Sequence, residues 1–223
     1  VPIHNRLNTM SPTKGQIYVI SAPSGTGKTS LVKALLERNV AAQVCVSHTT
    51  RKIRPGEADG LNYFFVSLKM FQEMLADKQF VESAEVFGYH YGTSKQEVNR
   101  ILSSGRHIIL EIDWQGALQV KAAMPESQLI FILPPSLAAL RERLINRNQD
   151  DHDTVERRLT GAMEEIKQHP HFNFLLINNI FETTLQALEQ ILFADGSSYE
   201  LNRQLTHLGP LINQLLQEPG NSP

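Results

Sequence analysis

The stretch Ile20-Ser-Ala-Pro-Ser-Gly-Thr-Gly-Lys-Thr29 decides the fold of this chain. It follows a short apolar run that begins at Ile17 and is typical of a buried strand. It leads into residues 30–38, whose leucines and valine recur at helical spacing. A strand, a glycine-bearing turn and a helix form the context that a phosphate-binding loop requires. Glycines let backbone N–H groups crowd around an anion, and the helix start adds the positive end of its dipole.

The loop residues predict a nucleoside triphosphate site. Lys28 is expected to reach the β- and γ-phosphates, and the Thr29 hydroxyl is expected to ligate Mg²⁺. The strict pattern begins with glycine, and this chain has Ala22 there. A chance turn rich in Gly and Ser is the alternative, but the position of Lys28 and Thr29 at the helix start disfavours it. The predicted ATP-binding residues are Ala22, Pro23, Ser24, Gly25, Thr26, Gly27, Lys28, Thr29 and Ser30.

The bulk composition is that of an ordinary globular protein. The chain has 223 residues, 41% of them hydrophobic, and a formal net charge of −2. This length suits one α/β domain with insertions, and the balanced charge gives no sign of a nucleic-acid partner. The single cysteine, Cys45, excludes an internal disulfide, and the apolar runs fall short of the ~20 residues that a spanning helix needs. We therefore expect a cytoplasmic enzyme without a membrane partner.

The two ends of the chain carry no visible chemistry. Residues 1–15 are polar and mixed, without the apolar core of a signal peptide, so we expect a disordered leader. Residues 199–216 have leucines at helical intervals, interrupted by Gly209-Pro210. This segment either packs on the core or joins subunits. Residues 218–223 are expected to be disordered.

A local positive cluster follows the second predicted strand, residues 43–47. Arg51, Lys52 and Arg54 precede a Pro-Gly turn. A solvated loop face is one interpretation of such a charge run. A second phosphate site is the other, and we favour it because ligands of open α/β sheets gather beyond the carboxyl ends of the strands. Arginine also offers a planar fork that binds phosphate oxygens in pairs.

The next segment predicts a small inserted lobe with a mixed sheet. Ser67 is expected to cap a helix over residues 67–78, and residues 80–87 alternate like a strand. Residues 88–93 are expected to form an aromatic turn, and residues 94–104 return to helix.

The remainder alternates strands with helices, which predicts a parallel, doubly wound sheet. The strand over residues 107–113 ends in Glu111 and Asp113, and such carboxylates close to Thr29 suit Mg²⁺ or its waters. Further strands are expected at residues 128–133 and 174–177. A helix is expected over residues 181–193, and Ser136 is expected to cap another whose apolar face is Leu137, Leu140, Leu144 and Ile145.

Arginines flank a polar segment after that helix. Arg141, Arg143 and Arg147 precede it, and Arg157 and Arg158 follow it. One interpretation is a lid that folds over the triphosphate and excludes water. The other, which the sequence supports about equally, is a solvated helix pair joined by salt bridges.

The motifs together resemble the guanylate kinase family, whose members phosphorylate GMP. The resemblance covers residues 15–193 and rests on Ser-Ala-Pro-Ser-Gly-Thr-Gly-Lys-Thr, Ser-His-Thr-Thr-Arg-x-x-Arg-Pro-Gly-Glu, Tyr-Gly-Thr, Glu-Ile-Asp-Trp-Gln-Gly and Ile-Leu-Pro-Pro-Ser. Bacterial members are similar to this chain in carrying Ala at the first loop position. The implied fold is α/β, a P-loop NTPase-type parallel sheet flanked by helices, with a small inserted mixed-sheet GMP-binding lobe and a lid. The implied divisions are a core over 16–46 and 95–194, the GMP-binding lobe over 47–94, a lid over 148–158 and a tail over 195–223.

The resemblance also implies the roles of the remaining site residues. Binding of the GMP phosphate falls on Ser47, Arg51, Arg54, Tyr63 and Tyr91. Guanine recognition falls on Glu82, Thr93 and Asp113, with Gly92 letting the backbone approach the base. The catalytic residues would be Lys28, Arg51, Arg143, Arg147 and Arg158, and Asn178 would line the ATP side. Asn148 replaces the glycine that usually follows the second lid arginine, which puts the hinge of the lid in doubt.

The implied activity is Mg²⁺-dependent transfer of the ATP γ-phosphoryl group to GMP and dGMP. A carboxylate such as Glu82 can accept both the N1–H and the amino group of guanine, whereas adenine presents an acceptor at N1. The implied partners are therefore ATP and GMP, and a homo-oligomer stays open. Two rivals are a guanylate-kinase-like scaffold module that binds phosphopeptides and a kinase acting on a phosphorylated sugar. The intact Lys28 disfavours the first, and Glu82 with Thr93 disfavours the second.

Overall fold

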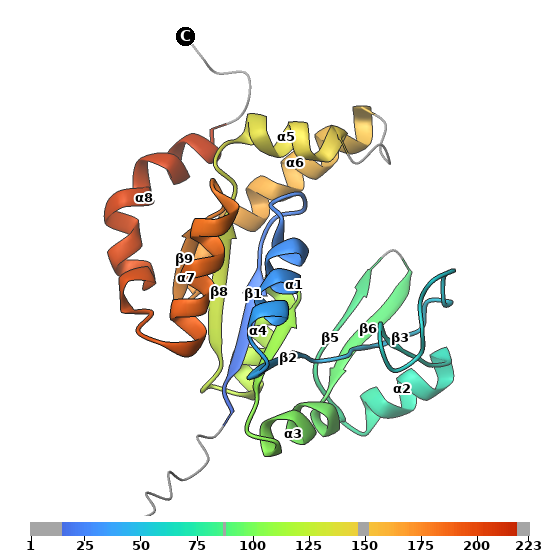
Figure 1. Ribbon diagram of the computed structural model, residues 1–223. Helices are drawn as coiled ribbons and strands as arrows, with labels where there is room; N and C mark the ends of the chain where they lie inside the picture. The colour runs from blue at the N-terminus through green and yellow to red at the C-terminus, as the bar shows by residue number, and fades with distance from the viewer. Residues whose placement is uncertain (1–14, 87, 147–151, 218–223) are drawn as a thin grey trace, which may run out of the picture.

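The computed structural model describes residues 15–86, 88–146 and 152–217 (Figure 1). The predicted leader up to residue 14, the end of the tail from residue 218, and residues 147–151 with Arg147 and Asn148 lie outside these ranges. Gly15 belongs to the described part and is buried.

The main sheet has five strands, and all of its pairs are parallel. Their order across the sheet is β2-β7-β1-β8-β9. The strands are β1 (Ile17–Ser21), β2 (Ala42–Val44), β7 (His107–Glu111), β8 (Gln128–Leu133) and β9 (Phe174–Ile177). Parallel strands need helical crossovers, so the observed order confirms the predicted flanked parallel sheet.

Helices cover both faces of this sheet. Helices α1 (Lys28–Arg38) and α7 (Phe181–Phe193) bury their apolar sides in one core. Helices α3 (Lys95–Ser103), α4 (Trp114–Ala123) and α8 (Leu201–Leu215) contribute to the other. Along β1, Val19 packs in the second core and Ile20 in the first, because successive strand side chains point to opposite faces.

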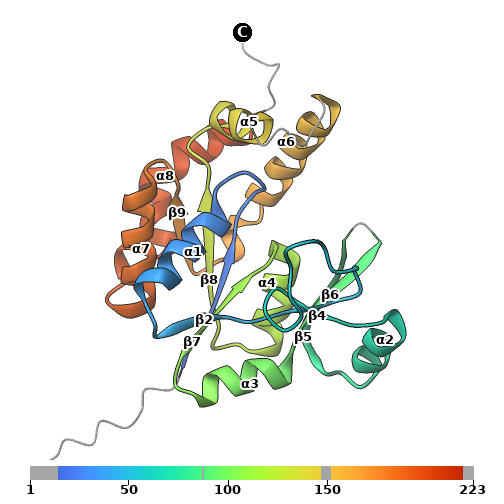
Figure 2. The ribbon, with the colours of Figure 1, turned by 45° about the vertical axis from the view of Figure 1, so that its right-hand side comes forward.

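A second, mixed sheet lies beside the first (Figure 2). Its order is β4-β3-β6-β5, from β3 (His48–Thr49), β4 (Phe64–Phe65), β5 (Phe80–Val86) and β6 (Tyr89–Ser94). Helix α2 (Leu68–Ala76) packs on it, and its Phe71 ring stacks on Phe80 at a centroid distance of 4.6 Å. The Ser67 hydroxyl accepts a hydrogen bond from the Met70 N–H, which confirms the predicted cap.

The predicted aromatic turn at residues 88–93 is wrong. Residues 89–93 belong to β6, which pairs antiparallel with β5 over its whole length. Gly88, with φ of 77°, supplies a left-handed turn conformation on its own. Tyr89 and Tyr91, which follow Gly88, lie in the strand β6, where aromatic side chains are favoured.

Helices α5 (Leu137–Ile145) and α6 (His152–Ile166) pack on each other through Leu140, Leu144, Val155, Leu159 and Ala162. The Ser136 cap is confirmed by its bond from the Ala139 N–H, but Ile145 is 52% exposed and does not belong to the apolar face. The Arg141 guanidinium binds both carboxylate oxygens of Glu156 across the pair. The salt-bridged helix pair is therefore present in this conformation.

The C-terminal segment packs on the core through one continuous helix. The predicted interruption at Gly209-Pro210 is wrong, because α8 runs through Pro210. A proline inside a helix costs ~3 kcal/mol, and burial offsets this cost. Ile212 and Leu215 are almost fully buried, and Leu205 and Leu208 pack against the same core. Two short 3₁₀ helices, His169–His171 and Ser197–Tyr199, complete the described elements.

No helix within the described ranges is both long and apolar enough to span a membrane.

Candidate active site

The loop between β1 and α1 has the backbone shape that the sequence predicts. Gly25 and Gly27 have φ of 89° and 100°, a region that side chains with a Cβ rarely adopt. Lys28 and Thr29 occupy the first positions of α1, with Gly27 as N-cap. A Cβ at Gly27 would lie 2.7 Å from Nδ2 of Asn178, so this position also lacks space for any larger residue.

Two predicted residues from distant elements hold this loop. Asn178, at the end of β9, donates from Nδ2 to the Thr26 carbonyl at 2.7 Å. Arg143, on α5, donates to the same carbonyl at 3.1 Å and to the Asn178 carbonyl at 3.2 Å. These two bonds place the guanidinium of Arg143 at the loop.

The predicted Lys28 lies in a cavity of about 290 Å³. Its ammonium group donates to the Ile112 carbonyl at 3.1 Å. Burial lowers the pKa of Lys28, and the nearby carboxylates Glu111, Glu165 and Asp113 oppose this shift. The cavity is lined by Ala22, Pro23, Ser24, Gly25, Gly27, Lys28, Thr29, Asp113 and Glu165. It therefore combines a glycine-rich backbone with one cation, as an anion site requires.

The two carboxylates predicted near Thr29 differ in their contacts. The Thr29 hydroxyl donates to the carboxylate of Glu111. Asp113 accepts the Gly116 N–H at 2.8 Å and thereby caps α4. No group of three His, Cys, Asp or Glu that could hold a metal occurs among residues 15–86, 88–146 and 152–217. The hydroxyl with one carboxylate still fits Mg²⁺, which binds through one or two protein oxygens plus water and substrate phosphates.

A second cavity, of about 260 Å³, lies between the two sheets and collects most of the predicted guanine and phosphate ligands. It is lined by Ser47, Tyr63, Glu82, Ala84, Val86, Tyr91, Glu111, Ile112 and Asp113. Asp113 lines this cavity and the loop cavity. A third cavity, of about 410 Å³, is lined by Thr29 of the loop together with Ser47 and Tyr63. The two predicted sites are therefore adjacent.

Glu82 and Thr93 form a buried polar pair in the second cavity. The Thr93 hydroxyl donates to Glu82 at 2.6 Å and lies 3.3 Å from the Ser47 hydroxyl. Burial raises the pKa of Glu82, and the bond from Thr93 opposes the shift. Packing alone favours glycine at position 92, because a Cβ there would lie 2.9 Å from the Phe80 ring.

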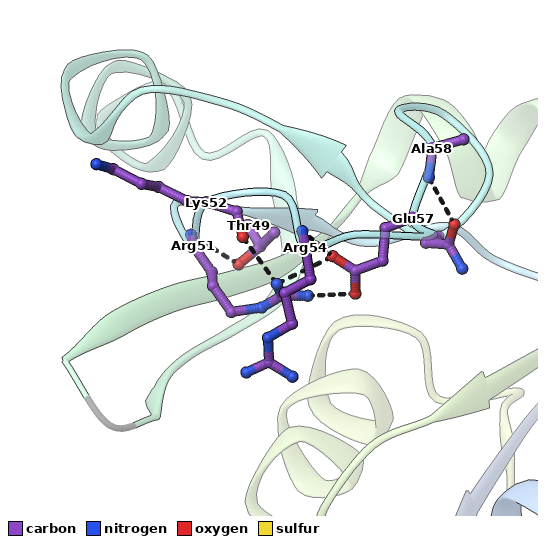
Figure 3. A network of polar contacts seen from close by, with 7 residues as sticks. Thr49, Arg51, Lys52, Arg54, Glu57 and Ala58 are labelled. Atoms are coloured by element: carbon purple, nitrogen blue, oxygen red, sulfur yellow. Dashed lines mark hydrogen bonds and ion pairs between the residues drawn. The ribbon is translucent and has the colours of Figure 1, made fainter.

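The predicted phosphate arginines lie in the loop between β3 and β4. Arg51 is 7% exposed and lies 5.5 Å from the centroid of the Tyr63 ring, which lines the second cavity. Arg54 is exposed, and its guanidinium makes no hydrogen bond or ion pair with any residue that the structure describes (Figure 3). Of the predicted lid arginines, Arg143 contacts the loop, Arg158 lies on α6, and Arg147 is outside the described residues.

Sequence reasoning missed two carboxylates. Glu165, on α6, lines the Lys28 cavity, and burial raises its pKa to about 7 while Lys28 opposes the shift. Glu57 binds the Arg51 guanidinium with both oxygens. Glu57 stood inside a quoted motif and could have been suspected from it. Glu165 carries no such signal, because its site is formed only when α6 meets the loop.

Another cavity, of about 510 Å³, lies at the opposite end of β1 beside Gly15 and Ile17. It contains none of the predicted site residues. The predicted site residues therefore gather at the carboxyl ends of the strands, where ligands of open α/β sheets bind.

Comparison with known proteins shows which family this chain resembles. The protein-family model described as "Guanylate kinase" matches residues 14–195. A guanylate kinase from Hahella chejuensis is 51% identical over 182 residues, which are 82% of this chain and 88% of that protein. One from Alkalilimnicola ehrlichii is 48% identical over 202 residues, covering 91% and 98%. The crystal structure of guanylate kinase from Anaplasma phagocytophilum is similar with a TM-score of 0.64, at 28% identity, over 90% of this chain and 97% of that one.

Proposed function

This chain belongs to the guanylate kinase family and is a nucleoside monophosphate kinase that transfers the γ-phosphoryl group of ATP to GMP; we propose that its two adjacent cavities hold these two substrates. The observation that carries the assignment is the buried Glu82–Thr93 pair, in a cavity that shares Asp113 with the Lys28 loop. Phosphoryl transfer needs such adjacency, because the acceptor oxygen must lie in line with the γ-phosphorus.

In the proposal, ATP binds over the loop from Ala22 to Ser30. Backbone N–H groups of the glycine-bearing turn bind the phosphates, and Lys28 moves from the Ile112 carbonyl to the β- and γ-phosphates. Arg143, already at the loop, neutralises charge that develops in the transition state, together with Arg147 and Arg158. Asn178 keeps the loop in its binding shape through the Thr26 carbonyl.

We further propose that Mg²⁺ is the metal of this reaction. Thr29, with Glu111 or Asp113 through water, would hold it, and when bound it neutralises phosphate charge. The chain itself needs no general base of high pKa, because the attacking phosphate oxygen of GMP is already anionic. Positioning and electrostatic stabilisation therefore account for the catalysis.

GMP is proposed to bind in the second cavity with its base against Glu82, Thr93 and Asp113. Glu82 accepts the two guanine donors, N1–H and the amino group, and Thr93 fixes the carboxylate through its 2.6 Å bond. The phosphate is proposed to bind Ser47, Arg51, Arg54, Tyr63 and Tyr91, and Gly92 lies on the same strand as Thr93. None of these contacts uses the ribose 2′-hydroxyl, so dGMP is expected to be a substrate as well.

The proposal extends to the organisation of the chain. Residues 47–94 would form the GMP-binding lobe, residues 16–46 and 95–194 the core, and residues 148–158 the lid. The packed conformation of α5 and α6 is compatible with closure over ATP, because Arg143 already contacts the loop. We also propose a cytoplasmic location, with a homo-oligomer left open.

A panel of nucleoside monophosphates with ATP and Mg²⁺ tests the function. GMP and dGMP should be phosphorylated, whereas AMP should lose about 10⁴-fold or more in kcat/KM because Glu82 would face its N1 lone pair. Glu82→Gln should reduce the preference for GMP over IMP and leave the KM for ATP within about twofold. Unchanged selectivity in this variant would remove Glu82 from base recognition. Turnover of a sugar phosphate but not of GMP would contradict the function itself.

A further inference from the structure

The quoted motif around Arg51 ends in Glu57, a residue to which the proposed function gives no role. The sequence Arg54-Pro-Gly-Glu57 folds into a tight turn, in which the Glu57 N–H donates to the Arg54 carbonyl at 3.1 Å. Gly56, with φ of 86°, occupies the position where a type II turn requires a positive φ, and Pro55 precedes it. The turn therefore brings the Glu57 side chain back toward the start of the loop.

The Glu57 carboxylate accepts hydrogen bonds from the Arg51 side chain and from the Arg54 backbone (Figure 3). Its two oxygens accept from Nη1 and Nη2 of Arg51 at 3.0 and 2.7 Å. One of them also accepts the Arg54 N–H at 2.8 Å. The side chains of Arg51 and Glu57 are only 8% and 19% exposed, so this pair is better shielded from solvent than an ordinary surface ion pair.

The hydrogen-bond donors of Arg51 are only partly used by these contacts. Nη1 also donates to the Lys52 carbonyl at 2.8 Å, so both of its hydrogens are engaged. Nη2 uses one hydrogen for Glu57. The guanidinium group has five donors, which leaves Nε–H and one hydrogen of Nη2 on the same edge of the planar group. Two parallel donors on one edge match two oxygens of a phosphate.

The neighbours of Arg51 show where this edge can be used. The bond to Glu57 raises the pKa of Arg51 most, and Tyr91 adds to the shift, so the Tyr91 hydroxyl is close to the guanidinium. The neighbouring rings of Tyr63 and Phe65 both lie near the group, with centroids 5.5 and 5.7 Å from Cζ. Tyr63 and Tyr91 also line the second cavity. The guanidinium therefore lies against aromatic rings beside the cavity, with one edge not taken by Glu57.

We propose that Glu57 is a positioning residue for nucleotide binding: it fixes Arg51 so that the Nε–Nη2 edge receives the phosphate of the acceptor nucleotide. An arginine side chain loses rotamer freedom when it is held in one geometry, and fixing it before the ligand arrives removes part of that cost from binding. This inference rests on the proposed function, in which Arg51 binds the GMP phosphate. Arg54, whose guanidinium has no described partner, then supplies the uncompensated charge that attracts the phosphate.

A competing role for Glu57, in which it blocks Arg51, predicts the opposite change in the KM for GMP. If the Glu57 carboxylate merely occupied Arg51 as a substitute for phosphate, GMP would have to displace it, and removing its charge would strengthen binding. If Glu57 positions Arg51, removing the charge releases the guanidinium and weakens binding. The sign of the change in KM for GMP therefore decides between the two roles.

The test compares full-length wild type with Glu57→Gln, Glu57→Asp and Arg51→Ala, with Glu73→Gln as the matched control. Glu73 lies on α2 in the same lobe with its side chain 63% exposed, so its variant should behave as wild type. For Glu57→Gln we expect the KM for GMP to rise at least tenfold, with the KM for ATP within about twofold. Glu57→Asp keeps the charge but shortens the side chain, so it should behave like the Gln variant.

The ratio of kcat/KM for GMP to that for IMP separates positioning from loss of structure. Both nucleotides carry the same phosphate, so Glu57→Gln should weaken both equally and leave this ratio unchanged, whereas a damaged lobe would change it. A KM for GMP that falls or stays constant in Glu57→Gln overturns the inference, and so does a changed GMP to IMP ratio. If Arg51→Ala leaves the KM for GMP unchanged, the proposed phosphate site itself fails. If Arg51→Ala raises that KM and Glu57→Gln does not, only the role of Glu57 fails.

Discussion

Replacing Glu165 by Gln should make the protein more stable at pH 8, and only slightly change its stability at pH 5. Burial beside the phosphate-binding loop raises the pKa of this carboxyl from 4.5 to about 7. Between these values the folded state keeps the proton that the unfolded state has lost. Folding stability therefore falls as the pH rises through this window, and the full cost is present above about pH 7.

The magnitude follows from the size of the shift. One pKa unit corresponds to about 1.4 kcal/mol, so a shift from 4.5 to about 7 sets a ceiling of ~3 kcal/mol on the gain from Glu165→Gln above pH 7. The side chain is only partly buried, so we expect ~1–2 kcal/mol. Near pH 4.5 the carboxyl is protonated in the folded state and about half protonated in the unfolded state, so the difference in stability is small and the amide replaces it with little change.

Urea unfolding at pH 5 and pH 8, in the absence of nucleotide, measures this difference. Glu164→Gln is the matched control, because Glu164 precedes Glu165 on α6 but is 63% exposed and pairs only with Lys167 at the surface. Glu164→Gln should change the free energy of unfolding by less than ~1 kcal/mol at both pH values. A Glu165→Gln stabilisation that is equal at pH 5 and pH 8, or larger at pH 5, would refute the reasoning.

Three further substitutions probe the loop and the C-terminal helix. Lys28→Ala should abolish turnover without loss of the fold, since the ammonium group makes a single described hydrogen bond, to a carbonyl; near wild-type kcat together with an unchanged melting temperature would contradict its catalytic role. Gly27→Ala should destabilise the protein by about 1–2 kcal/mol in urea unfolding and raise the KM for ATP, because its φ is 100° and the Cβ would crowd Asn178; wild-type values for both would show that the loop tolerates a side chain. Pro210→Ala should raise the free energy of unfolding by ~1–2 kcal/mol, because α8 runs through this residue; a lower stability would mean that the proline ring packs better than it disrupts.

Local sequence signals placed several elements well, although β2 ends at Val44 rather than at residue 47 and β7 ends at Glu111 rather than at residue 113. The phosphate-binding loop, the caps Ser67 and Ser136, and the strands at 128–133 and 174–177 were all predicted at or near their observed positions. Each of these depends on residues that are neighbours in sequence, so short patterns carry the information. The family was identified in the same way, because its motifs are contiguous.

Predictions were wrong where tertiary packing overrides local preference. Gly209-Pro210 indicates an interruption in sequence, but burial of Ile212 and Leu215 keeps α8 helical. The aromatic residues after Gly88 resemble a turn in isolation, but pairing with β5 makes them a strand. Ile145 was predicted to belong to the apolar face of its helix but is exposed, because α6 packs on α5 through Leu140 and Leu144.

The sequence by itself determined which chemical groups are proposed to bind phosphate and guanine, and in which order the elements that carry them follow each other. Only the tertiary structure decided which groups meet: Glu165 with the Lys28 cavity, Asn178 and Arg143 with the Thr26 carbonyl, and Glu57 with Arg51 in a shielded pair. The physical reason is that pKa shifts and hydrogen-bond partners depend on burial and distance in space. Residues far apart in sequence acquire both only when the chain has folded.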